Sequence, residues 1–314
     1  MTGHDDQSSR TTEFYRPLAA YATLVRVPNL FTAPPDVILG AAIAASLGHV
    51  VPVETIVGLS VASMLLYAAG TTLNDYFDAT EDARERPDRP IPAGDISRRQ
   101  ALLFGGTLLG GGVAVAALSG GVTAGVVAAV LALAILSYDG VFNGSPTGFL
   151  VMGGCRGTNV LLGTAAALSP AVLPVQALSI PAIIVLYISG VTYMAETETE
   201  TGESDSLAVS AAVVGTAVAV VGVVGALVVN SPSPASTAVA ITLLVGFAVW
   251  TAQPLRAAYA HPSPRTIGPA VGACVVGLTI LTAAFAATVG IEWSLAAVVF
   301  FIPAVALARV VDVS

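Results

Sequence analysis

The chain has 314 residues, of which 55% are apolar and 10% are charged, and its mean hydropathy is +0.84. Soluble domains carry about 25% charged residues, so this composition excludes an ordinary soluble protein and predicts an integral membrane protein. The net charge is −8 and lysine is absent, which argues against a nucleic-acid partner because such a partner requires a basic patch.

Apolar runs near or above the roughly 20 residues that cross a bilayer as a helix recur along the chain. They lack the alternation of apolar and polar residues that marks a membrane barrel, which favours helices. The sequence therefore predicts an all-α fold, a polytopic transmembrane helical bundle of nine to ten spans around a central cavity open to the cytoplasm. The expected spans are residues 28–48, 53–73, 101–118, 121–138, 149–168, 177–195, 207–229, 236–254, 267–289 and 293–311.

Residues 1–16 are expected to form a polar tail without the features of a cleaved signal peptide, and residues 17–314 a single transmembrane domain. All twelve basic residues are arginine, and threading ten spans from a cytoplasmic amino terminus puts each at a cytoplasmic end or loop. We therefore expect a multi-pass protein of the cell membrane whose active face is cytoplasmic.

The first predicted span contains three polar residues at helical spacing. Arg26, Asn29 and Asp36 are separated by three and seven residues, which predicts one inward-facing stripe on a continuous helix. Pro34 and Pro35 are expected to kink that helix, so a structural role for Asp36 stands beside a substrate-binding one.

The second predicted span ends in a cluster of acids. Asn74, Asp75, Asp78 and Asp82 lie at helical spacing on one membrane boundary. Mg²⁺ takes oxygen ligands and usually sits between one or two carboxylates and a substrate phosphate. The cluster therefore predicts Mg²⁺ as cofactor and a substrate that carries a phosphate or diphosphate.

Three arginines follow this acidic cluster within ten residues. Arg84, Arg86 and Arg89 carry the side chain best shaped to bind phosphate oxygens in pairs. We expect Arg86 and Arg89 to contact substrate. An acidic loop alone is most often only solvated, and it is the combination of acids with arginines that favours a site.

A further arginine lies inside the fifth predicted span. A guanidinium at the bilayer centre costs about 2.5 to 3.5 kcal/mol on translocon scales, so Arg156 should face the bundle interior and have an anionic partner. Asn159 lies three residues on, along the same face. Both residues are expected to line the cavity and contact diphosphate or acceptor, while snorkelling of Arg156 to the membrane surface is the alternative.

The run from Asn74 to Asp82, with the Arg-Pro-Asp-Arg-Pro-Ile-Pro-Ala-Gly sequence that ends at Gly94, resembles the first aspartate-rich motif and adjoining loop of the UbiA superfamily of membrane prenyltransferases. The resemblance covers roughly residues 18–290. It implies a helical bundle that joins an isoprenyl diphosphate to an aromatic or other acceptor with Mg²⁺. The sequences around Arg26 to Asp36 and Cys155 to Asn159 are similar to the EboC-like branch of the superfamily.

The resemblance also implies roles for individual residues. Asn74, Asp75, Asp78 and Asp82 match the residues that bind diphosphate and its Mg²⁺, and Arg89 holds the matching loop position. The family's second acidic motif is represented by Glu196 and Glu200, which keep its spacing and would share a helical face as metal ligands. Tyr138 resembles a tyrosine of the family, but the basic residues that commonly follow it are missing. The residues expected to act in catalysis are Asp75, Asp78, Asp82, Arg156 and Tyr138, and those expected to bind substrate are Arg26, Asn29, Arg86, Arg89 and Asn159.

The predicted function is Mg²⁺-dependent transfer of an isoprenyl group from an isoprenyl diphosphate to an aromatic or lipid-precursor acceptor in the bilayer, with release of diphosphate. The alternatives are a non-catalytic UbiA-like carrier of lipids or isoprenoids and a transporter, although a transporter predicts a repeat between halves that the sequence does not show. Asp36, Asp75 and Asp139 are equal candidates for a general base. Acceptor identity, prenyl chain length and oligomeric state cannot be read from the sequence.

Overall fold

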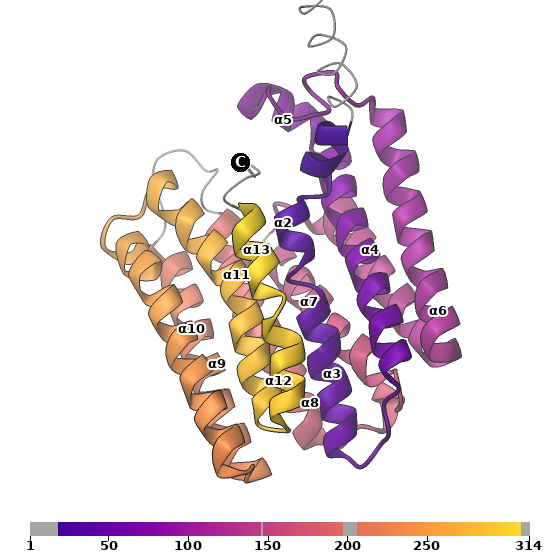
Figure 1. Ribbon diagram of the computed structural model, residues 1–314. Helices are drawn as coiled ribbons and strands as arrows, with labels where there is room; N and C mark the ends of the chain where they lie inside the picture. The colour runs from indigo at the N-terminus through magenta and orange to yellow at the C-terminus, as the bar shows by residue number, and fades with distance from the viewer. Residues whose placement is uncertain (1–17, 146, 197–205, 309–314) are drawn as a thin grey trace, which may run out of the picture.

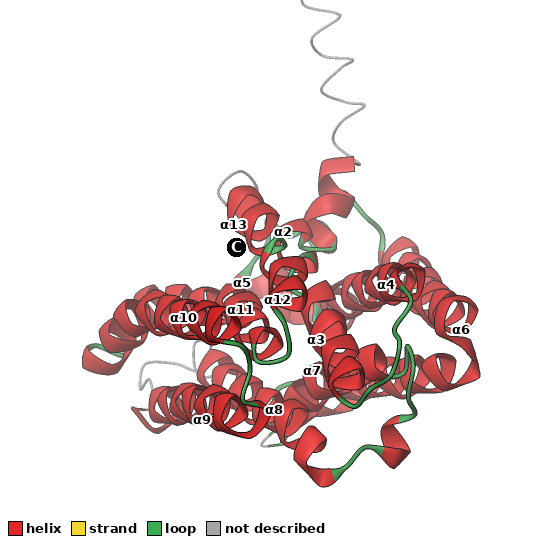
Figure 2. Cartoon of the chain, turned by 60° about the horizontal axis from the view of Figure 1, so that its bottom comes forward, coloured by secondary structure: helices red, strands yellow, loops and turns green. Residues whose placement is uncertain are grey.

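The computed structural model describes residues 18–145, 147–196 and 206–308, and every regular element in these ranges is helical (Figures 1 and 2). The elements are α2 (Val27–Leu30), α3 (Pro34–Ser46), α4 (Val53–Phe77), α5 (Ala79–Glu85), α6 (Arg98–Ser137), a π-helical turn (Tyr138–Phe142), α7 (Gly148–Thr164), a 3₁₀ turn (Pro170–Val172), α8 (Val175–Glu196), α9 (Ser206–Asn230), α10 (Pro234–Ala260), α11 (Pro264–Ala287), α12 (Ile291–Val298) and α13 (Phe301–Ala308).

The distribution of side chains is that of a membrane protein. Large apolar side chains such as Leu118, Val221 and Val249 point outward and are mostly exposed, whereas Asp36 and Asn159 are buried. An apolar exterior around a polar interior is unstable in water and stable in lipid. The structure thus confirms a polytopic helical bundle.

One element, α6, is two spans rather than one. Gly121 has a left-handed φ of 75°, and a Cβ built on Gly125 would lie 2.8 Å from that of Ala117. Eight residues along a continuous helix are about 12 Å apart, so the chain reverses at Gly121 and α6 is an antiparallel hairpin. Eight described helices are long and apolar enough to span a membrane. Division of α6 adds a ninth and the 17-residue α7 a tenth, in agreement with the predicted ten.

The start of the bundle differs from the prediction. Arg26 has a left-handed backbone with φ of 49°, and α2 ends before α3 begins at Pro34. Pro34 and Pro35 occupy the first turn of α3, where no intrahelical donor is needed, so they start a helix instead of kinking one. The predicted continuous stripe of Arg26, Asn29 and Asp36 is therefore wrong.

Apart from Arg156, which is buried within α7, the described arginines lie toward one end of the bundle. In Figure 1, α5 and the connection between α10 and α11 are at the upper end, and Arg256, near the end of α10, and Arg265, at the start of α11, flank that connection. The connection between α3 and α4, which carries His49, and the connection between α9 and α10 are at the lower end. The acidic cluster at the end of α4 thus shares its end of the molecule with the arginines.

Helices α3 and α7 pack at backbone contact. A Cβ on Gly40 would overlap the carbonyl oxygen of Val160, and a Cβ on Gly163 would overlap that of Val37. Small residues permit such close approach in membranes. This contact matters for function because α3 and α7 carry the buried Asp36 and Arg156.

We predict that Gly163→Ala lowers the free energy of unfolding by about 1–3 kcal/mol, because the added methyl group pushes α3 from α7. Gly106→Ala is the matched control, since nothing lies within 4 Å of a Cβ at Gly106. Denaturation in mixed micelles with SDS measures both. Equal effects of the two substitutions would show that the α3–α7 contact is not tight.

Candidate functional site

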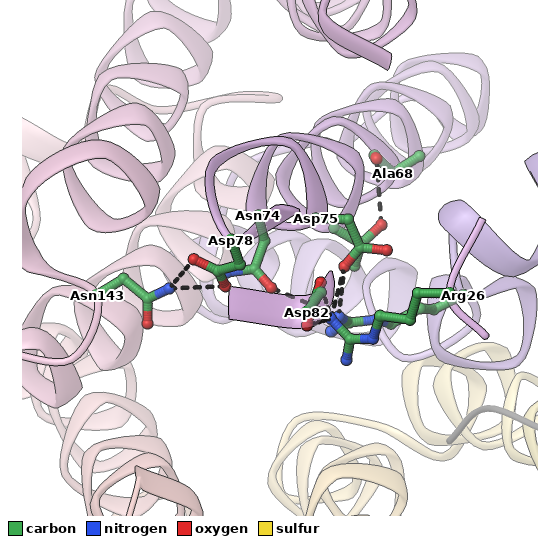
Figure 3. Close-up of polar contacts among 9 residues, drawn as sticks. Arg26, Ala68, Asn74, Asp75, Asp78, Asp82 and Asn143 are labelled. Carbon is green, nitrogen blue, oxygen red and sulfur yellow. Dashed lines mark hydrogen bonds and ion pairs between the residues drawn. The ribbon is translucent and has the colours of Figure 1, made fainter. Parts of the chain in front are cut away.

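The acidic cluster is built by the end of α4 and the start of α5. Asn74 and Asp75 lie in the last turn of α4, Asp78 caps its end, and Asp82 lies in the first turn of α5. The amide of Asp78 donates to the carbonyl of Asn74 and the amide of Asp82 donates to that of Asp78, both at 2.9 Å. These turns keep the side chains close together, as Figure 3 shows.

Two arginines from different segments bind these acids. Arg26 donates to Asp75 Oδ1 at 3.0 Å and to Asn74 Oδ1 at 3.4 Å, while Arg89 donates to Asp75 Oδ1 at 3.2 Å and to Asp82 Oδ2 at 2.8 Å (Figure 3). Asp75 and Asp82 are buried, and ion pairs of low exposure are shielded little by solvent. Arg89 lies beside the acids as expected from the sequence, whereas the contact of Arg26 with Asp75 was not expected.

Asp78 is held differently. Its two carboxylate oxygens each accept a hydrogen bond of 3.0 Å from the side-chain amide of Asn143, and no described arginine pairs with it. Burial raises the pKa of Asp78 to about 6, although the bond from Asn143 acts in the opposite direction. The charge of Arg89 also lowers the pKa of Asp78, but among the described residues no arginine forms an ion pair with its carboxylate, so a bound cation would meet a carboxylate that no guanidinium contacts.

A second network lies deeper, between α3 and α7. Arg156 Nη1 donates to Asp36 Oδ2 at 3.0 Å and to the Thr32 carbonyl at 3.2 Å, and its Nη2 donates to Thr32 Oγ1 at 2.6 Å. Asn159 Nδ2 donates to Asp36 Oδ2 at 3.1 Å, and Ser63 Oγ donates to Asn159 Oδ1 at 2.7 Å. Arg156 is buried, so it faces inward as expected and does not snorkel. The anionic partner of Arg156 is the carboxylate of Asp36, which belongs to the protein itself.

A cavity of about 210 Å³ joins the two networks. Its apolar wall includes Leu66, Leu131, Ile135 and Met152 and suits a hydrocarbon chain. Its polar lining residues are Arg26, Ser63, Tyr67, Thr71, Asn74, Tyr138, Asp139, Arg156 and Asn159. The lining comes from α4, α6, the π-helical turn, α7 and the segments just before α2 and α3, so the cavity belongs to the amino-terminal half of the bundle.

The structure places other predicted residues elsewhere. Arg86 is exposed at the end of α5, and Asn29 is outside the cavity lining. Glu196 ends α8 beside Gly148, where a Cβ would lie 3.3 Å from its Oε1, at the end of the bundle that also holds Asp78 and Asn143. Glu200 lies outside the described residues.

Several cavity residues were missed from the sequence. Ser63, Tyr67 and Thr71, which were missed, recur every four residues along α4, followed three residues later by the predicted Asn74, and all four line the cavity. This polar stripe in an apolar helix is a signal that could have found them. Asn143 lies in a loop and shows no such periodicity.

The donor chemistry fits Mg²⁺. Among the described residues no group of three His, Cys, Asp or Glu side chains converges on a point that could hold a metal ion. An Mg²⁺ ion bound largely by a diphosphate, however, needs only one or two protein carboxylates. The carboxylate of Asp78 and the nearby amide oxygen of Asn74 are donors of this kind, with Asp75 and Asp82 beside them.

Comparisons with known proteins agree with this geometry. Residues 37–209 match the model of the UbiA prenyltransferase family. The chain is 36% identical over 148 residues to the digeranylgeranylglyceryl phosphate synthase of Haloquadratum walsbyi, an alignment of 46% of this chain and 49% of that protein. It is 36% identical over 113 residues to the same synthase of Methanosarcina barkeri, with 36% of this chain and 39% of that protein covered. The matches thus span about half the length of these relatives or less.

Solved structures show the same fold. The apo structure of a UbiA homolog from Aeropyrum pernix has a TM-score of 0.64 at 16% identity, covering 81% of this chain and 96% of that chain. A UbiA homolog from Archaeoglobus fulgidus bound to DMAPP and Mg²⁺ has a TM-score of 0.56 at 16% identity, covering 89% and 99%. Because the family model covers more than half of the sequence, the chain belongs to the UbiA prenyltransferase family.

Proposed function

We propose that this protein transfers an isoprenyl group from an isoprenyl diphosphate to an aromatic or lipid-precursor acceptor within the membrane, with Mg²⁺ as cofactor and diphosphate as the second product. The observation that carries the proposal is the position of the acid and arginine cluster at the mouth of a largely apolar cavity. The diphosphate would bind at the cluster and the hydrocarbon tail in the cavity. The Archaeoglobus structure with DMAPP and Mg²⁺ supports the same pairing of ligands.

Asn74, Asp75, Asp78 and Asp82 are the residues that would hold Mg²⁺, with Glu196 and Glu200 as a second set. The ion supplies neutralising charge to the diphosphate when it is bound. Arg26 and Arg89 bind carboxylates in the ligand-free protein, and both are placed to turn to phosphate oxygens once a cation compensates those acids. Their charge would then stabilise the diphosphate as its bond to the allylic carbon breaks.

The other predicted catalytic residues, Tyr138 and Arg156, line the cavity and are not part of the acidic cluster. Tyr138 and Arg156 both lie in its wall and are buried, where they position the reacting ends and exclude water. The apolar wall would hold the isoprenoid, and each buried methylene contributes about 0.8 kcal/mol. The gathering of arginines at the end that carries the cluster supports a cytoplasmic active face by the positive-inside rule.

The test is release of diphosphate by the purified protein in lipid nanodiscs. With geranylgeranyl diphosphate, Mg²⁺ and a panel of aromatic and glycerol-based acceptors, we expect diphosphate release that depends on one acceptor and stops when EDTA removes Mg²⁺. Addition of excess Mg²⁺ should restore the rate. Binding of the isoprenoid without diphosphate release, unchanged by EDTA, would favour the carrier function instead.

A further inference from the structure

We propose that Asn143 determines which divalent cation the acidic cluster binds, because it holds the carboxylate of Asp78 so that a cation can use one of its oxygens but not both. Mg²⁺ is suited to that arrangement, and Ca²⁺ is disfavoured by it. The inference rests on the proposed function, since it concerns the cation that Asp78 would bind there. Asn143 acts through Asp78 and is therefore a positioning residue.

The side-chain amide of Asn143 fills the space between the two oxygens of Asp78. Its Nδ2 lies 3.0 Å from Oδ1 and 3.0 Å from Oδ2, and Figure 3 shows the amide pointing at the carboxylate. The opposite orientation would place the amide oxygen against two carboxylate oxygens, and acceptors repel one another. A chelating cation must also lie between both oxygens of a carboxylate. Chelation by Asp78 and its hydrogen bonds from Asn143 therefore exclude one another.

The backbone around Asn143 is fixed by a compact turn. The N–H of Asn143 donates to the carbonyl of Tyr138 at 2.7 Å, a wide bond across five residues that ends the π-helical turn. Gly144 follows with a left-handed φ of 67°, and the Phe142 carbonyl lies so close to Gly148 that a Cβ there would overlap it. The side chain of Asn143 is thus held by a rigid segment and loses little entropy when it binds Asp78.

Mg²⁺ and Ca²⁺ differ in how they use a carboxylate. Mg²⁺ demands a near-ideal octahedron of ligands at about 2.0–2.1 Å, whereas Ca²⁺ takes about six to eight oxygens at about 2.3–2.6 Å and binds carboxylates through one oxygen or both. The two oxygens of one carboxylate are too close together for adjacent corners of an octahedron. Mg²⁺ therefore needs one oxygen of Asp78, which keeps lone pairs on the side away from Asn143. Ca²⁺ must break the hydrogen bonds or bind with fewer ligands.

The neighbouring acids do not supply a free chelating position. Arg89 Nη1 lies 3.0 Å from Oδ1 and 2.8 Å from Oδ2 of Asp82, so a guanidinium fills the equivalent space there. Asp75 Oδ1 accepts from both Arg26 and Arg89. At Asp78 the same position is filled by a neutral amide, which blocks chelation but adds no positive charge to repel a cation.

The test measures how Mg²⁺ and Ca²⁺ support binding of a diphosphate to the full chain in phosphatidylcholine nanodiscs. The probe is radiolabelled geranylgeranyl S-thiolodiphosphate, in which sulfur replaces the bridging oxygen and the bond to the allylic carbon resists cleavage. Retention of the probe is measured over buffered concentrations of either free ion, with empty nanodiscs subtracted. The result is the half-saturating Ca²⁺ concentration divided by that of Mg²⁺. The affinity of each ion for the free probe is the same in every sample, so it cancels between variants.

Asn143→Ala should lower this ratio about tenfold, because Ca²⁺ no longer has to break hydrogen bonds to a charged group. Asn143→Asp keeps the size of the side chain and replaces the donor by a second carboxylate, so it should also lower the ratio. Asn230→Ala is the matched control, since the Asn230 amide donates to Thr288 at the opposite end of the bundle. It should leave the ratio unchanged. A role of Asn143 in folding alone would weaken retention with both ions equally.

The inference is overturned by an unchanged ratio in Asn143→Ala, or by a wild type that retains the probe equally well with Ca²⁺ or without either ion. If Asn143→Ala does not fold, Asn143→Asp decides. The assay involves no prenyl transfer, so the two proposals fail separately. A shifted ratio in a protein that never releases diphosphate would refute the proposed function alone, and an unchanged ratio in an active enzyme would refute the role of Asn143 alone.

Discussion

Replacement of Asp78 by alanine is expected to lower kcat/KM for prenyl transfer about 100- to 1000-fold, the loss typical for removal of one group that stabilises transition-state charge. Asp75 and Asp82 are already bound by arginine, whereas the hydrogen bonds that Asp78 accepts within the described part of the chain come from the neutral side-chain amide of Asn143. A cation that approaches the cluster therefore binds Asp78 without displacing a guanidinium. Rates of diphosphate release over a range of Mg²⁺ and substrate concentrations measure the effect.

Glu81→Ala is the matched control for Asp78→Ala. Glu81 lies three residues further along, in the first turn of α5, and its side chain is exposed. The substitution removes the same charge from the same end of the bundle, and exposed substitutions of this kind change little. We expect a change within about twofold. Comparable losses in both variants would mean that overall negative charge, rather than a carboxylate at position 78, supports the reaction.

The fold could be predicted from the sequence because a bilayer requires long apolar helices, and runs of that length are visible in the sequence. A span needs about 20 apolar residues, and the polar segment around α5, which separates two apolar runs in the sequence, falls at a bundle end. Gly120 and Gly121 mark the reversal inside α6, which divides a 40-residue element where the prediction placed two spans. The stripe from Arg26 to Asp36 failed because helical spacing presumes a continuous helix, and the left-handed residue at Arg26 is not visible in the spacing.

The site was predictable where its parts are local. Asn74 to Asp82 lie within one short segment, so their proximity follows from helical geometry. Arg89 was expected beside these acids, but the long-range ion pairs were not predicted, because Arg26 reaches Asp75 across 49 positions and Arg156 reaches Asp36 across 120. Such pairs depend on how helices pack, which the periodicity of one helix does not encode. Arg86 and Arg89 were both expected to bind substrate, yet of these two Arg89 turns inward, after the break at the end of α5, and Arg86 is exposed.

The buried pair of Arg156 and Asp36 gives the largest predicted effect on stability. Asp36→Leu leaves a charged guanidinium in a buried site, and loss of one partner from a buried ion pair costs about 3–5 kcal/mol. Asp36 is fully buried and also accepts from Asn159, so little solvent is available to compensate the loss. We expect a similar cost for Arg156→Met, which leaves the carboxylate with Asn159 alone. SDS denaturation in mixed micelles measures the free energy of unfolding.

The double variant Asp36→Leu, Arg156→Met should be more stable than either single variant, because it removes both charges and fills the space with apolar atoms. It should remain about 1–3 kcal/mol below the wild type, since the Thr32 carbonyl and hydroxyl lose the guanidinium that satisfies them. The coupling between the two substitutions is then large and favourable, as expected for residues in direct contact. If the costs of the single variants simply add, Asp36 and Arg156 do not stabilise one another.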